Sequence, residues 1–279
     1  MSKPVLIDQP NLSLAWAEAF LALRERSGHR VSPLTLSFTG IADGQVTEVP
    51  GIRGALDDTL KASDMQKVQS VANTIFPLSL WRHAKGDRAA LYAEYRANLP
   101  EYVAMEPHKN RRGLYFARLI AYGMDAVSGE QLAYVPPDSI PEGGNQLEFI
   151  IQHCKAGVRQ SMFQASIFDP ARDHTAAAQL PFPCLQHVTF VHDFKAGTLA
   201  LNAFYATQQL FEKGYGNYLG LARLGNFVAG EIGLSLERVT CFVGIEKMEH
   251  KPSEGPALRS LVAACEQALA AEPAVTEDR

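Results

Sequence analysis

Hydrophobic residues recur first at helical spacing and then at alternating positions near the start of the chain. Trp16, Phe20 and Leu23 lie three or four positions apart, which is the spacing of one helix face. The segment from Asn11 to Gly28 is therefore predicted to be a helix. The segment from Leu34 to Thr39 alternates with a period of two, and it predicts a strand that runs into a turn.

Later segments continue this alternation of helical and strand patterns. A chain that alternates in this way is typical of helices packed on a mixed sheet, so an α/β (α+β) fold in a single domain, residues 1–279, is predicted. The predicted elements are the helix-like segment Gly51 to Asn73, helix Arg88 to Leu99 closed by Pro100, helix Asn145 to Lys155, strand Met162 to Phe168, the hairpin of strands Gln186 to Phe194 and Thr198 to Phe204, helix Tyr218 to Ile232, strand Arg238 to Met248, and helix Pro256 to Ala271.

Two segments lack such a pattern. Residues 126–144 are rich in proline and glycine, which predicts a loop or insertion. We interpret this stretch as an insertion and not as a domain linker, because a helix and a strand follow it directly. Residues 272–279 are polar and are expected to form a mobile tail.

Composition narrows the classes of partner. The formal net charge is -4, so the chain lacks the basic field that holds a nucleic-acid polymer, and a small-molecule partner is expected. Without an apolar run of roughly 18 residues or a signal-like leader, we expect a cytoplasmic protein without a membrane segment. Its four cysteines are scattered and are expected to be reduced, with no metal site.

One run of residues carries the chemistry. It begins at Phe182-Pro183-Cys184 and continues through Tyr205 and Gly214 to Asn217. In order and approximate spacing, it resembles the catalytic segment of the thymidylate synthase family. The resemblance implies a thymidylate synthase-like fold, a nucleophilic Cys184, a substrate site that includes Tyr205, and an Asn217 that reads the pyrimidine ring.

Two upstream motifs extend the resemblance. Tyr115, Arg118 and Leu119 match the family's Tyr-Gly-Glu-Arg-Leu motif, whose tyrosine helps to remove the proton at carbon 5. This implies a catalytic Tyr115 and a substrate-binding Arg118. Arg159 matches an arginine that reaches the phosphate of the other subunit in the family's dimer. The resemblance thus implies a homodimer that uses 5,10-methylenetetrahydrofolate and a pyrimidine substrate.

The chain also departs from the family pattern. Thr207 and Gln208 stand where the family has the phosphate-binding arginine and serine, so Gln208 is expected in the substrate site but the bidentate phosphate donor is lost. Gln209 and Leu210 stand near the place of the aspartate that contacts the folate. Leu78 stands at the place of the family's glutamate base.

Each candidate also has a structural interpretation. A free cysteine such as Cys184 is commonly a small buried hydrophobe, because its thiol is a weak donor. Tyr115 could be an aromatic part of the core, and Asn217 could cap a helix. Pairing of Cys184 with His187 as in a cysteine hydrolase is disfavoured, because residues three apart on a strand point to opposite faces. His192 lies far along that strand.

Two functions therefore follow from the sequence. The first is folate-dependent transfer of a methyl or hydroxymethyl group to carbon 5 of a pyrimidine nucleotide or nucleoside through an adduct with Cys184. The second is a paralogue without catalysis that keeps the fold and binds a ligand or a partner subunit.

Overall fold

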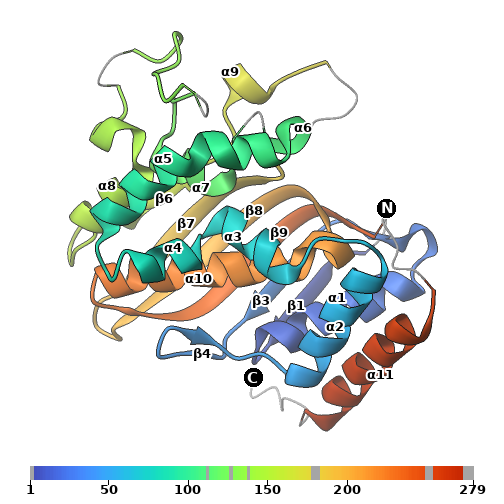
Figure 1. Ribbon diagram of the computed structural model, residues 1–279. Helices are drawn as coiled ribbons and strands as arrows, with labels where there is room; N and C mark the ends of the chain where they lie inside the picture. Colours follow the sequence, from blue (N-terminus) through green and yellow to red (C-terminus); the bar gives the residue numbers. More distant parts are fainter. Residues whose placement is uncertain are drawn as a thin grey trace.

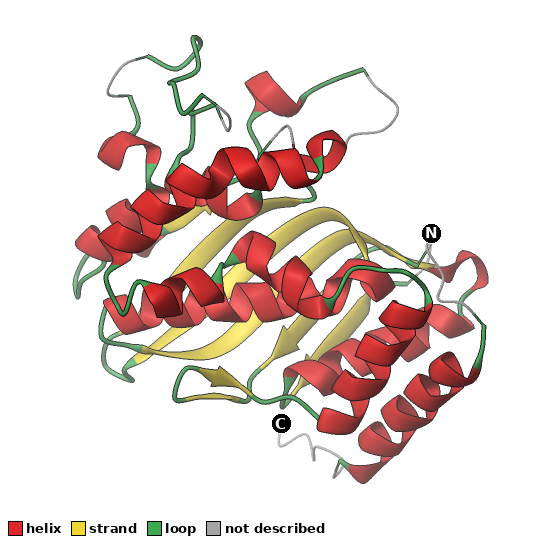
Figure 2. Cartoon of the chain, viewed as in Figure 1, coloured by secondary structure: helices red, strands yellow, loops and turns green. Residues whose placement is uncertain are grey.

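A twisted mixed sheet forms the centre of the computed structural model, which describes residues 3–110, 113–125, 128–136, 139–176, 183–248 and 254–272 (Figures 1 and 2). In these residues the chain is a single mixed α/β domain with helices on one side of the sheet. The strands are β1 (Val5–Gln9), β2 (Arg30–Val31), β3 (Leu34–Phe38), β4 (Ile41–Ala42), β5 (Gln45–Val46), β6 (Gln164–Ser166), β7 (Leu185–Asp193), β8 (Thr198–Gln209) and β9 (Ser235–Lys247).

Helices fill the long intervals between the strands. Several short helices lie in the middle third of the chain, above the sheet in Figure 1. The α-helices are α1 (Leu12–Glu25), α2 (Pro50–Ala62), α3 (Val68–Ile75), α4 (Leu78–His83), α5 (Arg88–Met105), α6 (Pro107–Asn110), α7 (Tyr115–Ile120), α8 (Gln146–His153), α9 (Pro170–Asp173), α10 (Tyr215–Glu231) and α11 (Pro256–Ala271).

The sheet pairs strands from the first forty residues with β9, which lies near residue 240. Its strand order is β1-β3-β9-β8-β7-β6, and β2 pairs with the end of β9. The pairs β1–β3 and β8–β9 are parallel, and the pairs β3–β9, β8–β7 and β7–β6 are antiparallel. The parallel pair β8–β9 therefore brings the carboxyl ends of two central strands to one edge, where side chains from both can meet.

Helices α1 and α10 lie directly on one face of the sheet, and α3 packs against α10. Two glycines of α10 allow this close approach. A Cβ atom at Gly216 would lie 2.5 Å from Cβ of Val71, and one at Gly220 would lie 2.8 Å from the carbonyl oxygen of Ala72. Larger residues would push α3 away and open the core.

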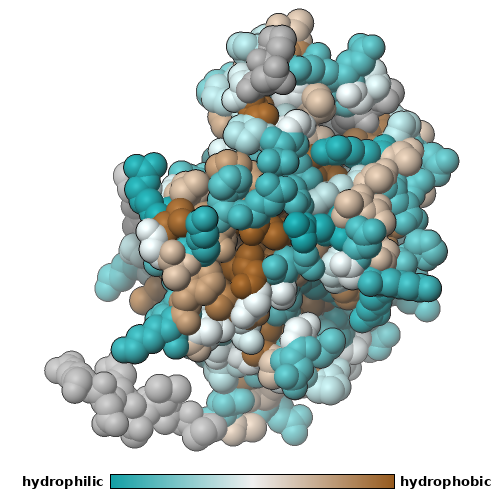
Figure 3. All heavy atoms as spheres, turned by 90° about the vertical axis from the view of Figure 1, so that its left-hand side faces the viewer, coloured by the Kyte–Doolittle hydropathy of each residue, from teal (hydrophilic) through white to brown (hydrophobic). Residues whose placement is uncertain are grey.

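The opposite face of the sheet keeps large apolar side chains in contact with solvent. Leu6 of β1 is 77% exposed, and Val191 of β7, Phe204 of β8 and Phe242 of β9 are about 40% exposed. In Figure 1 the helices that cover the sheet lie in front of it. Figure 3 views the molecule from the left of Figure 1, and it shows hydrophobic residues gathered at the centre of that side among hydrophilic ones.

In strands β7, β8 and β9, the alternation of inward-facing and outward-facing side chains is interrupted at neighbouring positions. Each has two successive half-buried residues where alternation would give one: positions 186–187, 206–207 and 244–245. Leu185 pairs with Tyr205 and Tyr205 pairs with Val243, so these positions lie side by side. A bulge of this kind moves the following side chains to the other face. It places Gln208 and Glu246 on the side that the helices cover.

Several element predictions agree with the structure and others do not. The helix predicted to end before Pro100 continues to Met105, because Tyr92, Tyr95, Leu99 and Val103 keep helical spacing across the proline and are buried.

The remaining differences are smaller. The predicted helix-like segment 51–73 is two helices, α2 and α3, and strand β1 was not predicted. In the loop 126–144, the described residues contain a bridge between Met124 and Gln131 and a short 3-10 turn at Pro141–Gly144. Residues 273–279 of the predicted tail, and also Phe182, lie outside the described residues. Across the described residues, the structure has no helix of the length and apolar character that a membrane crossing needs.

Candidate active site

Residues from separate parts of the chain meet where β7 begins. Cys184 directly precedes β7, Tyr115 is the first residue of α7, and Tyr205 lies on β8 opposite Leu185. The amide N–H of Ala206 donates to the carbonyl oxygen of Cys184 at 3.1 Å, which ties this residue to β8. The structure thus brings together three of the residues that the sequence singled out.

Tyr115 contacts the backbone of the cysteine segment. Its hydroxyl hydrogen-bonds with the backbone of Leu185 and Cys184, and burial followed by the nearby Cys184 raises the pKa of the phenol. Tyr115 remains half-buried, so it belongs to the wall of the site and not to the centre of the core. A neutral phenol in this position can donate or accept a hydrogen bond.

Tyr205 is fully buried, and its hydroxyl has no hydrogen-bond partner among the described residues. Burial, and then the neighbouring Tyr115, raise the pKa of this phenol. Cys241, Cys184 and Glu246 are the other titratable groups around it. An unpartnered buried hydroxyl is costly, because the group loses its hydrogen bonds to water on folding.

Cys184 is the most accessible of the four cysteines, since it is half-buried and the other three are buried. Burial raises the pKa of its thiol, while the positive charges of Lys247 and Lys213 act in the opposite direction. An activated cysteine nucleophile has a lowered thiol pKa, but here removal from water outweighs the two ammonium groups and the thiol pKa is raised. At neutral pH most Cys184 is a thiol and not a thiolate.

Asn217 lies in the first turn of α10 and is 5% exposed. It does not cap this helix, because Gly214 occupies the cap position. The Nδ2 atom of Asn217 donates to Oε1 of Gln208 at 3.2 Å. Gln208 is itself 2% exposed, and both its amide nitrogen and its amide oxygen hydrogen-bond to protein groups. It therefore holds the Asn217 side chain in place.

Two members of this polar group were not predicted from the sequence. Glu246 of β9 lies opposite Gln208 and is fully buried, and Tyr218 of α10 is also fully buried. Nε2 of Gln208 donates to the Tyr218 hydroxyl at 2.8 Å and to Oε2 of Glu246 at 3.2 Å. Simple alternation along β8 and β9 would place Gln208 and Glu246 on the outward face of the sheet. The bulge turns them inward, so the sequence pattern did not indicate that they are buried.

Glu246 is a buried acid with an open hydrogen-bonding position. Its Oε1 atom has no hydrogen-bond partner among the described residues, and burial raises the pKa of the carboxyl well above its ordinary value. Hydrogen bonds from Tyr218 and Gln208 oppose this effect only in part. Such a carboxyl keeps its proton to a higher pH than an exposed one, and in the protonated form it can donate a hydrogen bond.

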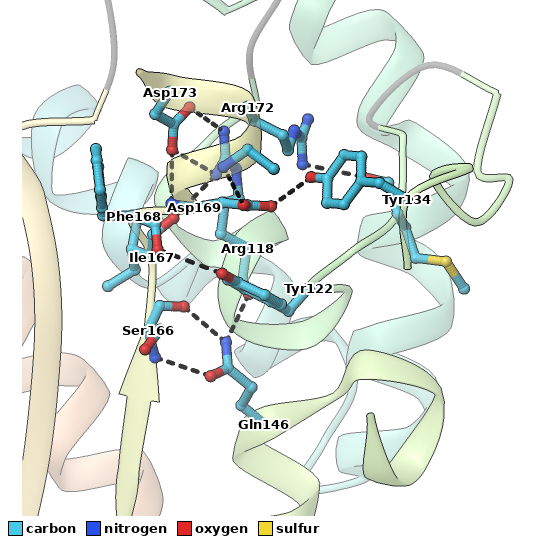
Figure 4. Close-up of polar contacts among 12 residues, drawn as sticks. Arg118, Tyr122, Tyr134, Gln146, Ser166, Ile167, Phe168, Asp169, Arg172 and Asp173 are labelled. Atoms are coloured by element: carbon cyan, nitrogen blue, oxygen red, sulfur yellow. Dashed lines mark hydrogen bonds and ion pairs between the residues drawn. The ribbon is translucent and has the colours of Figure 1, made fainter. Parts of the chain in front are cut away.

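Arg118 lies in a different environment from the one expected for a substrate ligand. Its Nη1 and Nη2 atoms both donate to the Asp173 carboxylate at 2.9 Å, and Nη1 also donates to the carbonyl oxygen of Ile167 at 3.0 Å (Figure 4). The guanidinium is 2% exposed. It joins α7 to α9 within the protein, so this geometry favours a structural role.

The surrounding contacts extend this junction. Gln146 donates to the carbonyl oxygens of Arg118 and Ser166, and it accepts from the amide N–H of Ser166. The Tyr134 hydroxyl donates to Asp169 (Figure 4). These bonds attach the segment after residue 128 to the edge of the sheet near β6.

Arg159 is exposed and precedes a 3-10 turn (Gln160–Met162) near the start of β6. It is not among the side chains around Cys184 in this subunit. The resemblance assigned it to the site of a second subunit, and its exposed position leaves it available for such a contact.

The positions of the family's phosphate and folate contacts have a different character. The Thr207 hydroxyl is buried and has no partner among the described residues. Leu210 is fully buried, and its carbonyl oxygen accepts from Nε1 of Trp16 at 3.2 Å. This place offers neither a guanidinium for a phosphate nor a carboxylate for a pterin ring, so these residues do not fit the folate of the resemblance.

Two other chemistries can be compared with this geometry. The imidazole of His187 hydrogen-bonds Gln164 at 2.9 Å, so it does not pair with Cys184 as a hydrolase base would. Within the described ranges, no cluster of histidine, cysteine, aspartate or glutamate could hold a metal ion. A cleft of about 340 Å³ lies elsewhere, between β4–β5, α4 and α10, and its lining includes Trp81, Arg82 and Arg223.

The sequence was also compared with known proteins. No protein-family model matches it, and no curated protein matches it significantly. The mixed α/β fold and the residues around Cys184 are therefore the basis for any statement about function.

Proposed function

We propose that this protein is an enzyme that adds Cys184 to carbon 6 of a pyrimidine ring and so prepares carbon 5 for transfer of a one-carbon unit, methyl or hydroxymethyl. The observation that carries the proposal is the meeting of Cys184, Tyr115 and Tyr205. Asn217 is linked to this group through Gln208 and Glu246, because Glu246 is also a neighbour of Tyr205. These residues come from separate elements, and their assembly in one place supports the resemblance to the thymidylate synthase family.

The chemistry begins with the sulfur. A thiolate attacks carbon 6, the C5–C6 double-bond pair moves toward carbon 5 and the ring carbonyl, and carbon 5 becomes a nucleophile. Lys213 and Lys247 favour the thiolate through their charge, and desolvation opposes it. A substrate that places a partially positive carbon 6 beside the sulfur would shift this balance toward addition.

The tyrosines and Asn217 act on the ring. The neutral phenols of Tyr115 and Tyr205 lie beside the cysteine and can hold a water molecule or a substrate oxygen by hydrogen bonding. Asn217 has one N–H and its Oδ1 acceptor left after its bond to Gln208. Those two groups match a ring edge with a carbonyl beside an N–H.

The donor of the one-carbon unit is carried over from the resemblance alone. The family uses 5,10-methylenetetrahydrofolate, but Gln209 and Leu210 supply no carboxylate for its pterin. The proposed steps therefore stop at the activated ring. With Thr207 in place of the phosphate arginine, a nucleoside or a differently substituted ring is favoured over the monophosphate.

One observation favours the second function, a paralogue without catalysis. Burial raises the pKa of the Cys184 thiol, which slows any nucleophilic addition at neutral pH. Such a protein would bind its ring through Asn217 without forming the adduct.

Exchange of the hydrogen at carbon 5 separates the two functions, because it requires only addition and reversal. Deoxyuridine labelled with deuterium at carbon 5 is incubated with the protein, and loss of the label is followed by mass spectrometry. We expect release by the unmodified protein and none by Cys184→Ser, with Cys154→Ser as the matched control that keeps the activity. Binding without exchange would support the paralogue, and neither binding nor exchange with uracil or cytosine nucleosides would overturn both.

A further inference from the structure

The cleft between the β4–β5 hairpin, α4 and α10 contains a pair of arginines. Its volume is about 340 Å³, and its lining includes Arg82 of α4 and Arg223 of α10. This volume lies in the range of small-molecule sites, which begins at roughly 300 Å³. Neither Cys184 nor Tyr115 is among the residues that line the cleft, so it is separate from the candidate active site.

Arg223 is half-buried and has no carboxylate partner among the described residues. Its Nη2 atom donates to Oε1 of Gln69 at 2.5 Å, and its Nη1 atom donates to Oδ1 of Asn73 at 3.4 Å. Both acceptors are neutral amides on α3. Burial first, and then the charges of Arg53 and Arg82, lower the pKa of the Arg223 guanidinium to about 10. The cleft therefore holds a partly desolvated cation that lacks a counter-charge.

The acids on the lining do not neutralise both arginines. Glu48 lies near Arg223 and opposes the lowering of its pKa. The Glu48 carboxylate is already bonded to the Arg53 guanidinium at 2.6 Å, and it accepts from the Tyr215 hydroxyl at 2.7 Å. Asp43 is exposed at the turn between β4 and β5, and it forms no ion pair in the part of the chain that the structure describes. An anion bound between the two arginines would relieve their mutual repulsion.

Aromatic side chains form another part of the lining. Trp81 precedes Arg82 on α4 and is half-buried, whereas Phe76 and Phe227 are buried. The rings of Trp81 and Phe227 meet edge to face, with centroids 4.9 Å apart and an angle of 81° between the ring planes. This contact holds the indole in one orientation, and its accessible part offers a flat apolar surface in the same cleft as the two guanidinium groups.

We propose that this cleft binds a phosphate monoester that carries an aromatic ring, with the phosphate between Arg82 and Arg223 and the ring against Trp81. A phosphate monoester has a charge of about -1.5 to -2 at pH 7 and three acceptor oxygens, so it can pair with both arginines. A carboxylate has a single charge and two oxygens, and it would leave one guanidinium without a counter-charge. The inference does not depend on the chemistry proposed for Cys184.

The test compares three probes by isothermal titration calorimetry: phenyl phosphate, phenol, which lacks the charge, and inorganic phosphate, which lacks the ring. We expect phenyl phosphate to bind the unmodified protein more tightly than either of the others. Arg82→Met and Arg223→Met should each weaken its binding about tenfold or more, the scale of one charge-assisted hydrogen bond. Trp81→Leu should reduce its affinity to that of inorganic phosphate. Arg259→Met, at an exposed position on α11, is the matched control and should leave its affinity unchanged.

Adenosine monophosphate distinguishes two sources of such a ligand, because it joins the same phosphate to a nucleoside. Binding that is tighter than that of phenyl phosphate and equally sensitive to Arg223→Met would support a nucleotide. Weaker binding with the same sensitivity would support a smaller aryl phosphate.

The inference is overturned by phenyl phosphate that binds no more tightly than inorganic phosphate, or that binds equally well to both arginine variants. Loss of binding in Cys184→Ser would also overturn it, because the probe would then occupy the candidate active site. Absence of binding by phenyl phosphate and adenosine monophosphate at millimolar concentration would overturn it and leave the proposed function intact. If Arg223→Met does not fold, Arg82→Met still provides the test, because Arg82 is exposed.

Discussion

Phe204 and Phe242 stack face to face on the open side of the sheet, with ring centroids 5.3 Å apart and 9° between the ring planes. They occupy paired positions on β8 and β9 and are 40% and 38% exposed. A stacked aromatic pair at the centre of an uncovered sheet face is a feature of protein interfaces.

We therefore predict an isologous homodimer through this face, with Phe204 near its centre. Val191 of β7, which is 41% exposed, lies on the same face. Phe204→Asp should weaken the dimer by a factor of at least about ten, because it buries a charge in an apolar contact. Light scattering after size exclusion measures this change.

The control for the dimer is Met105→Asp, an equally drastic change at a residue that is 74% exposed on α5. It should leave the assembly unchanged. A monomeric unmodified protein at micromolar concentration would contradict the prediction and also weaken the resemblance to the family.

Cysteine reactivity should follow burial and pH. Cys184 is the half-buried cysteine, and burial raises the thiol pKa of Cys154 to about 11 and of Cys265 to about 12. Iodoacetamide should label Cys184 first, at a rate that keeps rising as the pH passes 9.0, because the thiolate is the reactive form. Peptide mapping by mass spectrometry measures the order. Faster labelling of Cys154 than of Cys184 would refute it.

Glu246 should make stability depend on pH. Its folded-state pKa lies well above the ordinary 4.5, so above that pH the folded protein keeps a proton that the unfolded chain releases. Stability from this group is complete below about pH 4.5 and is lost as the pH rises, by up to about 1.4 kcal/mol per pH unit. Glu246→Gln removes this dependence. Urea unfolding of both proteins across neutral pH checks the sign, and parallel pH profiles would show that the carboxyl is ionised in the fold.

The ion pair between Arg118 and Asp173 should be important for stability. Asp173→Asn leaves a buried guanidinium without its counter-charge, and we expect a loss of about 3–5 kcal/mol in the free energy of unfolding. The exposed pair Arg238–Asp8 is the control, where Asp8→Asn should cost at most about 1 kcal/mol. Equal effects at the two sites in urea unfolding would show that the first pair is hydrated.

Two glycine-to-alanine substitutions should change the stability of the protein in opposite directions. A Cβ atom at Gly244 would lie 2.9 Å from the carbonyl oxygen of Ala206, so Gly244→Ala should destabilise the protein by about 1–3 kcal/mol. Gly230 lies in α10 with open space around it, so Gly230→Ala should stabilise the protein by up to about 1 kcal/mol. Thermal unfolding measures both. A stable Gly244→Ala would mean that the bulge can relax.

Periodic segments could be read from the sequence because their local pattern and their packing agree. The helix predicted at Pro256 to Ala271 has those bounds in the structure, and the turn predicted at residues 195–197 joins β7 and β8. Strand β1 was not predicted, because Leu6 points into solvent and the strand has one fully buried residue, Ile7. Its pairing with β3 is a long-range property that local alternation does not encode.

The candidate site was predictable only where a motif marks it. Cys184, Tyr115 and Tyr205 could be named, and they lie together. Arg118 matched the same motif, but the carboxylate that binds it lies 55 residues away. Glu246 and Tyr218 could not be recognised, because the bulge and the packing of α10 determine that they meet Gln208.

The pairing of β3 with β9 has a consequence for biosynthesis. Ser37 and Thr240, which share a hydrogen bond across this pair, are 203 residues apart in the chain. The central sheet cannot close until β9 has left the ribosome, and until then the apolar side chains of β3 lack the strand that pairs with them. Loop closure over this distance slows the final assembly, and the partly made chain exposes apolar surface in the meantime. A message truncated before β9 would yield a product for degradation and not a smaller functional protein.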